Sequence, residues 1–199
     1  MLFIFDMGGV VTSTFHLDAL YDELKITKNQ FFEICNHNCG KTKKDIWDDF
    51  QSGRINTKEF WKSFNKRSKK YGVKPVNNDL FRLFFHPVLN EQTVELINRL
   101  KQKHRVVCGT NTIDSHWENH MERGDYAFFH QTYASNRIGE VKPDTAFYEM
   151  IMKAEGYTPE QTFFTDDRSD NIESARSLGI NAVQFTSAEE LSKLWSIYC

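Results

Sequence analysis

The first residues combine a short apolar run with a carboxylate and two glycines. Leu2–Phe5 is wholly apolar, which suits a strand buried on both faces, and Asp6 follows it at once. A carboxylate at the end of a buried strand is costly unless something offsets it, and Gly8 and Gly9 let the backbone turn and approach a ligand closely. Asp6 is therefore either the reactive group of an active site or an acid that caps the next helix.

Further polar groups stand where later strands and turns are expected to end. They are Thr110-Asn111 after residues 105–109, Lys142 in a turn before a helix, and Asp166-Asp167 after residues 162–165. Each alone is weak evidence, since acids at strand ends also cap helices and Lys-Pro is common at the first turn of a helix. Because the carboxyl ends of parallel strands share one edge of a sheet, the set together with Asp6 predicts one active site.

Alternating helical and apolar segments from residue 91 onward provide the framework. Helices are expected at 91–103, 144–155 and 169–178, and strands at 105–109, 131–134, 162–165 and 182–185. This alternation with short connections predicts an α/β fold, a doubly wound, Rossmann-like parallel sheet with helices on both faces.

Residues 17–85 show helical spacing of apolar residues and no convincing strand. One helix is expected to begin near Thr57, with Phe60, Trp61 and Phe64 as its buried stripe, and such aromatic stripes are typical of a core rather than a cofactor site. The expected domains are an α/β core over residues 1–14 and 86–199 and a small all-helical cap over residues 15–85.

The motifs resemble those of the haloacid dehalogenase superfamily of hydrolases, and among them the phosphatases with a helical cap after the first strand. The matching segments are Phe5-Asp6-Met-Gly8-Gly-Val, Cys108-Gly-Thr110-Asn111, Val141-Lys142-Pro143 and Asp166-Asp167-Arg-Ser-Asp-Asn171-Ile-Glu-Ser-Ala. The length, the cap and the Asp-x-Gly opening are also similar to those of bacterial enzymes that dephosphorylate α-D-glucose 1-phosphate. The resemblance implies a magnesium-dependent phosphatase of a small phosphorylated metabolite, with a sugar 1-phosphate as a candidate.

The resemblance also implies roles for the residues at the reacting centre. Asp6 would attack phosphorus and form an aspartyl-phosphate, which splits the hydrolysis into two steps. Lys142 would contact both the nucleophile and the phosphoryl group. Mg²⁺, a hard cation that prefers oxygen ligands, would be held by Asp6, the Gly8 carbonyl and Asp167.

The remaining residues of the set would bind substrate or support the others. Thr110 with the Asn111 amide would donate hydrogen bonds to the transferring oxygens, which is electrostatic stabilisation by fixed donors. Asp166, also counted as catalytic, and Asn171 would support Lys142 and the water shell of the metal. A purely structural role for these last two stays open.

Gly8 departs from the pattern of the family. Most of its phosphatases have a second aspartate at this place, which protonates the leaving oxygen and later activates water, and such help is typically worth about 10²–10⁴-fold. Three explanations are open. The substrate has a good leaving group that needs little protonation, or water or another side chain replaces the missing aspartate, or the protein has lost turnover. The first alternative agrees with a sugar 1-phosphate, since an anomeric hydroxyl is more acidic than an ordinary alcohol.

Two other functions are compatible with the family resemblance. A catalytically silent fold that binds a ligand or a partner protein would explain Gly8. A 2-haloacid dehalogenase would also lack the second aspartate and need no metal, but Asp166 and Asp167 beside Asp6 would repel a carboxylate substrate.

Three further clusters have ordinary explanations. Cys35, His37 and Cys39 lie close together, but a structural zinc site needs a fourth ligand, so free thiols are expected. His116 and His120 have helical spacing without the glutamate of a metalloprotease motif, and they are candidates for the pocket entrance. The basic run at 66–70 is expected to be a solvated helix face.

Composition excludes several classes of partner. The chain has 199 residues, enough for one sizeable domain or a core with an insert, and its net charge of −2 gives no footprint for nucleic acid or an anionic membrane. No apolar run reaches the length of a membrane span, and the start lacks the features of a signal peptide. A cytoplasmic protein is expected, and the oligomeric state is not indicated.

Overall fold

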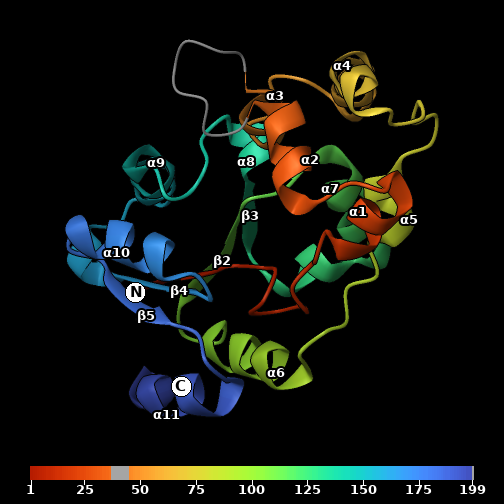
Figure 1. Ribbon diagram of the computed structural model, residues 1–199. Coiled ribbons are helices and arrows are strands. Elements are labelled where there is room, and N and C mark those ends of the chain that lie inside the picture. Colours follow the sequence, from red (N-terminus) through yellow and green to blue (C-terminus); the bar gives the residue numbers. More distant parts are fainter. Residues whose placement is uncertain (37–44, 199) are drawn as a thin grey trace.

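The computed structural model describes residues 1–36 and 45–198, and its centre is a parallel five-stranded sheet in the order β3-β2-β1-β4-β5 (Figure 1). The strands are β1 (Leu2–Phe5), β2 (Arg105–Thr110), β3 (Gln131–Ala134), β4 (Thr162–Asp166) and β5 (Asn181–Gln184). The chain switches direction at β1, from which β2 lies on one side and β4 on the other. This confirms the α/β, Rossmann-like fold class, and such a switch point is where ligands bind in open sheets.

Helices cover both faces of the sheet. Helices α6 (Glu91–Leu100) and α11 (Ala188–Trp195) share a hydrophobic cluster with Phe3 and Phe5 on one face. On the other face, α9 (Thr145–Glu155) and α10 (Ser169–Ser177) share a cluster with Leu2 and Ile4. Because successive side chains of a strand point to opposite faces, the wholly apolar β1 requires this double cover.

The helices between β1 and residue 85 have a hydrophobic cluster of their own. They are α1 (Asp18–Leu24), α2 (Lys28–Cys35), α3 (Ile46–Gln51), α4 (Thr57–Ser68) and α5 (Leu80–Phe84). Their cluster is rich in aromatic residues, with Phe50 and Phe60 stacked at 4.7 Å between ring centroids. Within the described residues this segment has no strand, as expected. The proposed domain limits at 15–85 stay a prediction.

Local signals explain most helix starts. A reciprocal capping box between Asn56 and Glu59 starts α4 at the predicted Thr57. Two helices were not expected from the sequence, α7 (Asp114–Arg123) and α11, and α8 (Ser135–Ile138) is a single turn. Helix α7 was missed because its polar and aromatic residues obscure the apolar period.

No helix in residues 1–36 and 45–198 is long and apolar enough to span a bilayer.

Candidate active site

The sheet register brings three strand ends together. Phe5 of β1 lies opposite Cys108 of β2 and Thr165 of β4. The residue after Phe5 is Asp6, whose backbone N–H donates to the Thr165 carbonyl at 3.0 Å. The carboxylates that follow β1 and β4 therefore point into one space, as the strand ends predicted.

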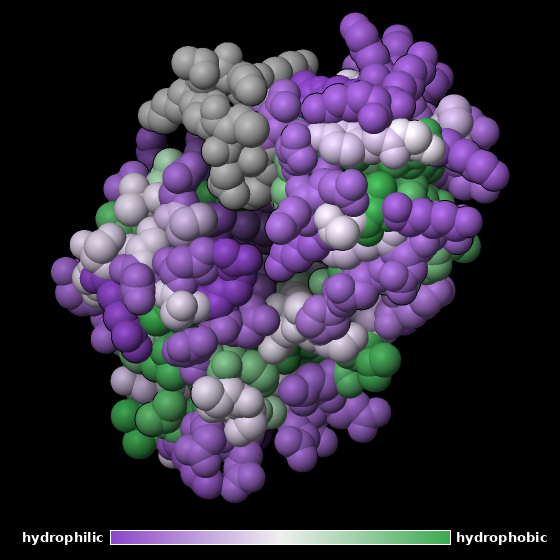
Figure 2. Space-filling view, in the orientation of Figure 1, coloured by the Kyte–Doolittle hydropathy of each residue, from purple (hydrophilic) through white to green (hydrophobic). Residues whose placement is uncertain are grey.

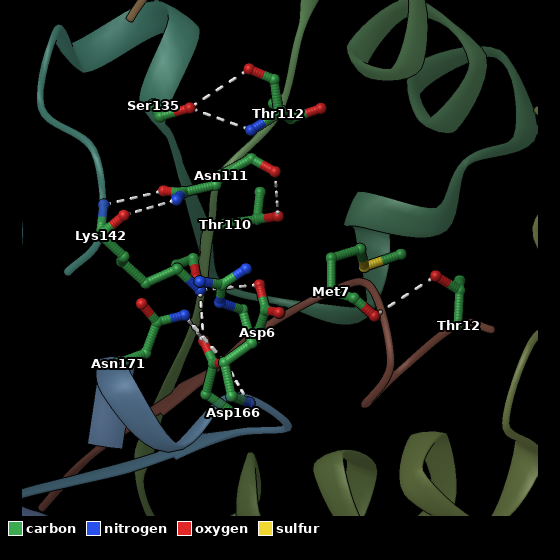
Figure 3. Close-up of polar contacts among 12 residues, drawn as sticks. Asp6, Met7, Thr12, Thr110, Asn111, Thr112, Ser135, Lys142, Asp166 and Asn171 are labelled. Atoms are coloured by element: carbon green, nitrogen blue, oxygen red, sulfur yellow. Dashed lines mark hydrogen bonds and ion pairs between the residues drawn. The ribbon is translucent and has the colours of Figure 1, made fainter. Parts of the chain in front are cut away.

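Lys142 is the buried centre of this space. Its Nζ lies 2.8 Å from Asp6 Oδ1 and 2.6 Å from Asp166 Oδ2, and it donates a further hydrogen bond to the Gly109 carbonyl at 2.9 Å (Figure 3). The Lys142 side chain is 1% exposed. A buried ammonium with three acceptors has all its donors engaged, so the position of its charge is fixed.

One ammonium between two carboxylates leaves this centre with excess negative charge. Burial raises the pKa of Asp6 to about 7. The negative charge of Asp166 also raises this pKa, whereas the positive charge of Lys142 lowers it without outweighing the burial. Burial lowers the pKa of Lys142, but Asp6 and Asp166 outweigh it, so the pKa of Lys142 is raised. A further cation at this place would relieve the repulsion.

Replacing Lys142 is expected to destabilise the protein, and more so at high pH. Lys142→Met leaves buried carboxylates without their cation, which costs about 3–5 kcal/mol. Without the charge of Lys142, the already raised pKa of Asp6 in the folded protein rises further, so the folded state binds a proton that the unfolded chain does not. The variant is therefore more stable at pH 5 and loses stability as the pH rises to 8. Denaturant unfolding without metal at both pH values measures the difference, with Lys62→Met, exposed on α4, as control. An equal loss at both pH values would contradict this charge balance.

Hydrogen bonds hold the groups around Lys142. Asn171 Nδ2 donates to both oxygens of Asp166 at 3.0 Å, and the Arg168 backbone N–H donates to Asp166 Oδ1 at 2.9 Å. The Asn111 amide side chain bonds both backbone groups of Lys142, donating to its carbonyl at 2.8 Å and accepting from its N–H at 2.9 Å. This clamp was not foreseen, since Asn111 and Lys142 are distant in sequence. Phosphoryl contacts of Thr110 and Asn111 stay predictions.

The oxygen ligands near Asp6 fit a hard divalent cation. Asp6, Asp166 and Asp167 each offer a carboxylate oxygen, and these atoms lie within 4.8 Å of one another. Asp166 is fully committed to Lys142 and Asn171, whereas Asp167 is half-buried and its pKa is raised by burial and by Asp166. Asp6 and Asp167 are therefore the better candidate ligands, and the role of the Gly8 carbonyl stays a prediction.

Gly9 has a conformation and a position that only glycine can adopt without strain. Its φ is +79°, and a Cβ would collide with the Asp167 carboxylate and lie 2.9 Å from Thr14 Oγ1. We expect Gly9→Ala to lower the free energy of unfolding by about 1–3 kcal/mol and to weaken magnesium binding by displacing Asp167. Thermal unfolding and metal titration measure both effects. Gly8→Ala, with no atom within 4 Å of its Cβ, is the matched control, and an equal response of the two variants would contradict the prediction.

The charged cluster lies at the floor of a cavity of about 930 Å³. It opens as a recess near the middle of the face shown in Figure 2, and the residues around its mouth are mostly hydrophilic. Asp6, Lys142 and Asp167 form its floor, and the rest is lined both by residues of the helical segment and by core residues between Thr110 and Asn171. The sequence did not predict which residues of the helical segment line the cavity, because the spacing of apolar residues in a helix does not indicate which of them face a cavity.

Two of the three other clusters have the following outcomes. His116 and His120 both border the cavity, but His120 Nδ1 bonds Asp125 Oδ2 at 2.8 Å, a structural contact. Substrate contact by these histidines stays a prediction. Cys35 is a buried free thiol whose pKa is raised by burial, while His37 and Cys39 lie outside the described residues.

The comparisons with known proteins agree with this geometry. A family model of hydrolases, described as haloacid dehalogenase-like hydrolase, matches residues 1–179. In fold, the chain is similar to a haloacid dehalogenase family enzyme of Bacteroides thetaiotaomicron solved with magnesium and inorganic phosphate. The TM-score is 0.73 at 22% identity, with 98% of each chain covered.

Two fungal proteins are similar in sequence. A drimenol cyclase of Aspergillus calidoustus is 27% identical over 161 residues, which are 75% of this chain and 29% of the cyclase. The chain therefore spans less than a third of that relative. A sesquiterpene phosphatase of Aspergillus oryzae is 23% identical over 190 residues, which are 92% of this chain and 88% of the phosphatase.

Proposed function

The chain belongs to the haloacid dehalogenase-like hydrolases, and we propose that it is a magnesium-dependent phosphatase that passes the phosphoryl group of its substrate to Asp6 and then to water. The match confirms the family predicted from the motifs. The observation that carries the proposal is the position of Lys142, with its Nζ 2.8 Å from Asp6 and 2.6 Å from Asp166. A fixed positive charge at this position supports the proposal, because it would offset the repulsion between an anionic nucleophile and an anionic phosphate.

Each residue of the site would have its own role in the reaction. Asp6 attacks phosphorus, the bond to the leaving oxygen breaks, and water later cleaves the aspartyl-phosphate to release phosphate and restore Asp6. Lys142 neutralises charge on the phosphoryl oxygens and orients Asp6. Bound between Asp6, the Gly8 carbonyl and Asp167, Mg²⁺ would supply the additional positive charge that this acidic centre requires.

The leaving group must compensate for Gly8, which cannot act as an acid or a base. We therefore propose substrates whose leaving group is acidic enough to depart without a proton donor. A sugar 1-phosphate meets this condition. The sesquiterpene phosphatase among the relatives suggests a second candidate, a phosphate carried by an apolar group.

A substrate screen tests the proposed function. We expect phosphate release from acetyl phosphate, aryl phosphates and hexose 1-phosphates to be faster than from hexose 6-phosphates, and to stop when EDTA removes magnesium. Chloride release from a 2-haloacid without metal would instead identify a dehalogenase, and no turnover of any substrate would identify a silent binding protein. Faster hydrolysis of hexose 6-phosphates would overturn the leaving-group proposal.

A further inference from the structure

The cavity above Asp6 is much larger than a phosphate group needs. Its volume of about 930 Å³ is near the upper end of the roughly 300–1,000 Å³ typical of pockets for whole organic ligands. Asp6, Lys142 and Asp167 lie together in one part of it, where they would hold the phosphoryl group, and further charged residues such as Asp48 and Arg54 border it elsewhere. Most of the volume is therefore available to the organic part of the substrate, and the lining of that space indicates its chemistry.

Apolar side chains from several separate segments meet at this cavity. They are Phe15 and Leu17 before α1, Phe32 on α2, Trp47 on α3, Phe85 after α5, and Ile113 before α7. Figure 1 shows α1, α2 and α3 grouped on one side of the sheet. Phe85 and Ile113 are buried, but Phe15, Leu17, Phe32 and Trp47 are only partly buried, so they leave hydrocarbon surface in contact with water unless a ligand covers it.

Three rings form the best-defined part of this apolar wall. Phe85 stacks on His116 with ring centroids 3.8 Å apart, and Phe15 lies edge-on to His116 at 4.6 Å and to Phe85 at 5.4 Å. Burial lowers the pKa of His116 to about 3, so its ring is neutral at pH 7. The wall is uncharged and suits an apolar group.

Polar residues of the helical segment also border the cavity, but two of them are already engaged. Ser52 Oγ donates to the Asp48 carbonyl at 2.7 Å, and Arg54 Nε donates to Asp49 Oδ1 at 2.8 Å. The hydroxyls of a sugar would each need a partner once removed from water, and a missing partner costs about 1–3 kcal/mol per group. The Ser52 hydroxyl has already donated its one proton, so it could only accept from a sugar hydroxyl, whereas the Arg54 contact uses Nε alone.

We propose that the substrate carries its phosphate on a hydrocarbon ring or chain, which lies against Phe15, Leu17 and Trp47. This inference rests on the proposed function, since it names the substrate class of the same site. Asp6 and Lys142 would act on the phosphoryl group at the floor. The wall above them would contribute binding by removing hydrocarbon surface from water.

Matched substrates test the inference with the intact protein and magnesium. Phenyl and 1-naphthyl phosphate have leaving groups of similar acidity, so a difference in KM reports contact with the cavity. We expect 1-naphthyl phosphate to have a lower KM than both phenyl phosphate and glucose 1-phosphate. Acetyl phosphate, which has no large organic group, serves as the test of the reaction itself.

Variants of one wall residue locate the contact. Phe15→Ala is expected to raise the KM for 1-naphthyl phosphate by about tenfold, and Phe15→Leu, which keeps an apolar side chain, to restore most of the affinity. Leu83→Ala is the control, since Leu83 is 55% exposed on α5 and does not border the cavity. Thermal unfolding shows that each variant is folded at the assay temperature.

The outcomes separate the inference from the proposed function. A lower KM for glucose 1-phosphate than for 1-naphthyl phosphate, or no response to Phe15→Ala, would overturn the inference, while hydrolysis of acetyl phosphate would keep the phosphatase. If acetyl phosphate is not hydrolysed either, the proposed function fails and the inference with it.

Discussion

Asp6→Asn is expected to reduce magnesium-dependent phosphate release by on the order of 10⁴–10⁶-fold, as for other hydrolases that lose their nucleophile. The amide has nearly the same shape as the carboxylate, but it is a poor nucleophile and a weak ligand for a hard cation. Because burial already disfavours the charged form of Asp6, a neutral side chain is tolerated by the fold. Phosphate release from acetyl phosphate measures the loss.

The control for Asp6→Asn is the same change at an exposed acid away from the site. Asp22→Asn on α1 should keep the wild-type rate. Thermal unfolding of both variants separates loss of chemistry from loss of fold. A wild-type rate with Asp6→Asn would show that another residue is the nucleophile.

Gly8→Asp is the second change for which we expect a large effect, this time a gain. Gly8 borders the cavity, it is not among the glycines with positive φ, and no atom lies within 4 Å of the place of its Cβ. A Cβ is therefore accommodated here without moving the backbone, and the side chain starts at the border of the cavity. It would supply the missing proton donor and base, so we expect hexose 6-phosphate hydrolysis to rise by about 10²–10⁴-fold.

Two features of the Gly8→Asp experiment make it selective. Acetyl phosphate, whose leaving group needs no proton, should gain less from the new acid than a hexose 6-phosphate does. Gly8→Asn has the same shape without a titratable proton, and it should give no gain. Equal rates for the aspartate and asparagine variants, with both folded, would show that acid–base help at this position is not what the chain lacks.

The charged floor of the site could be predicted from the sequence because it depends on strand ends. Asp6 follows the buried strand β1 and Asp166 is the last residue of the buried strand β4, and the direction of a parallel sheet then brings them to one edge. Lys142 belonged to the same set, but its role beside Asp6 came from the family resemblance, since a lysine in a turn carries no chemical signature of its own. Its burial depends on the Asn111 clamp, which joins residues far apart in the chain.

The upper part of the cavity could not be predicted in the same way. Phe15, Trp47 and Phe85 lie in or beside the segment with helical spacing, and that spacing alone does not show which ring meets a cavity. Tertiary packing decides this, because the helices between β1 and residue 85 are placed by their own aromatic cluster. Helix α7 was missed for a related reason, since His116 is buried by Phe85 rather than by an apolar stripe.

Chemical trapping of the phosphorylated protein tests the central claim most directly. After rapid quenching of the reaction with ³²P-labelled acetyl phosphate and magnesium, reduction of the acyl phosphate with borohydride and peptide mapping locate the modified residue. We expect the label on Asp6, in an amount that builds up because Gly8 provides no base to activate water for the second step. Label on another residue, or turnover without any labelled protein even at the earliest times, would contradict the account.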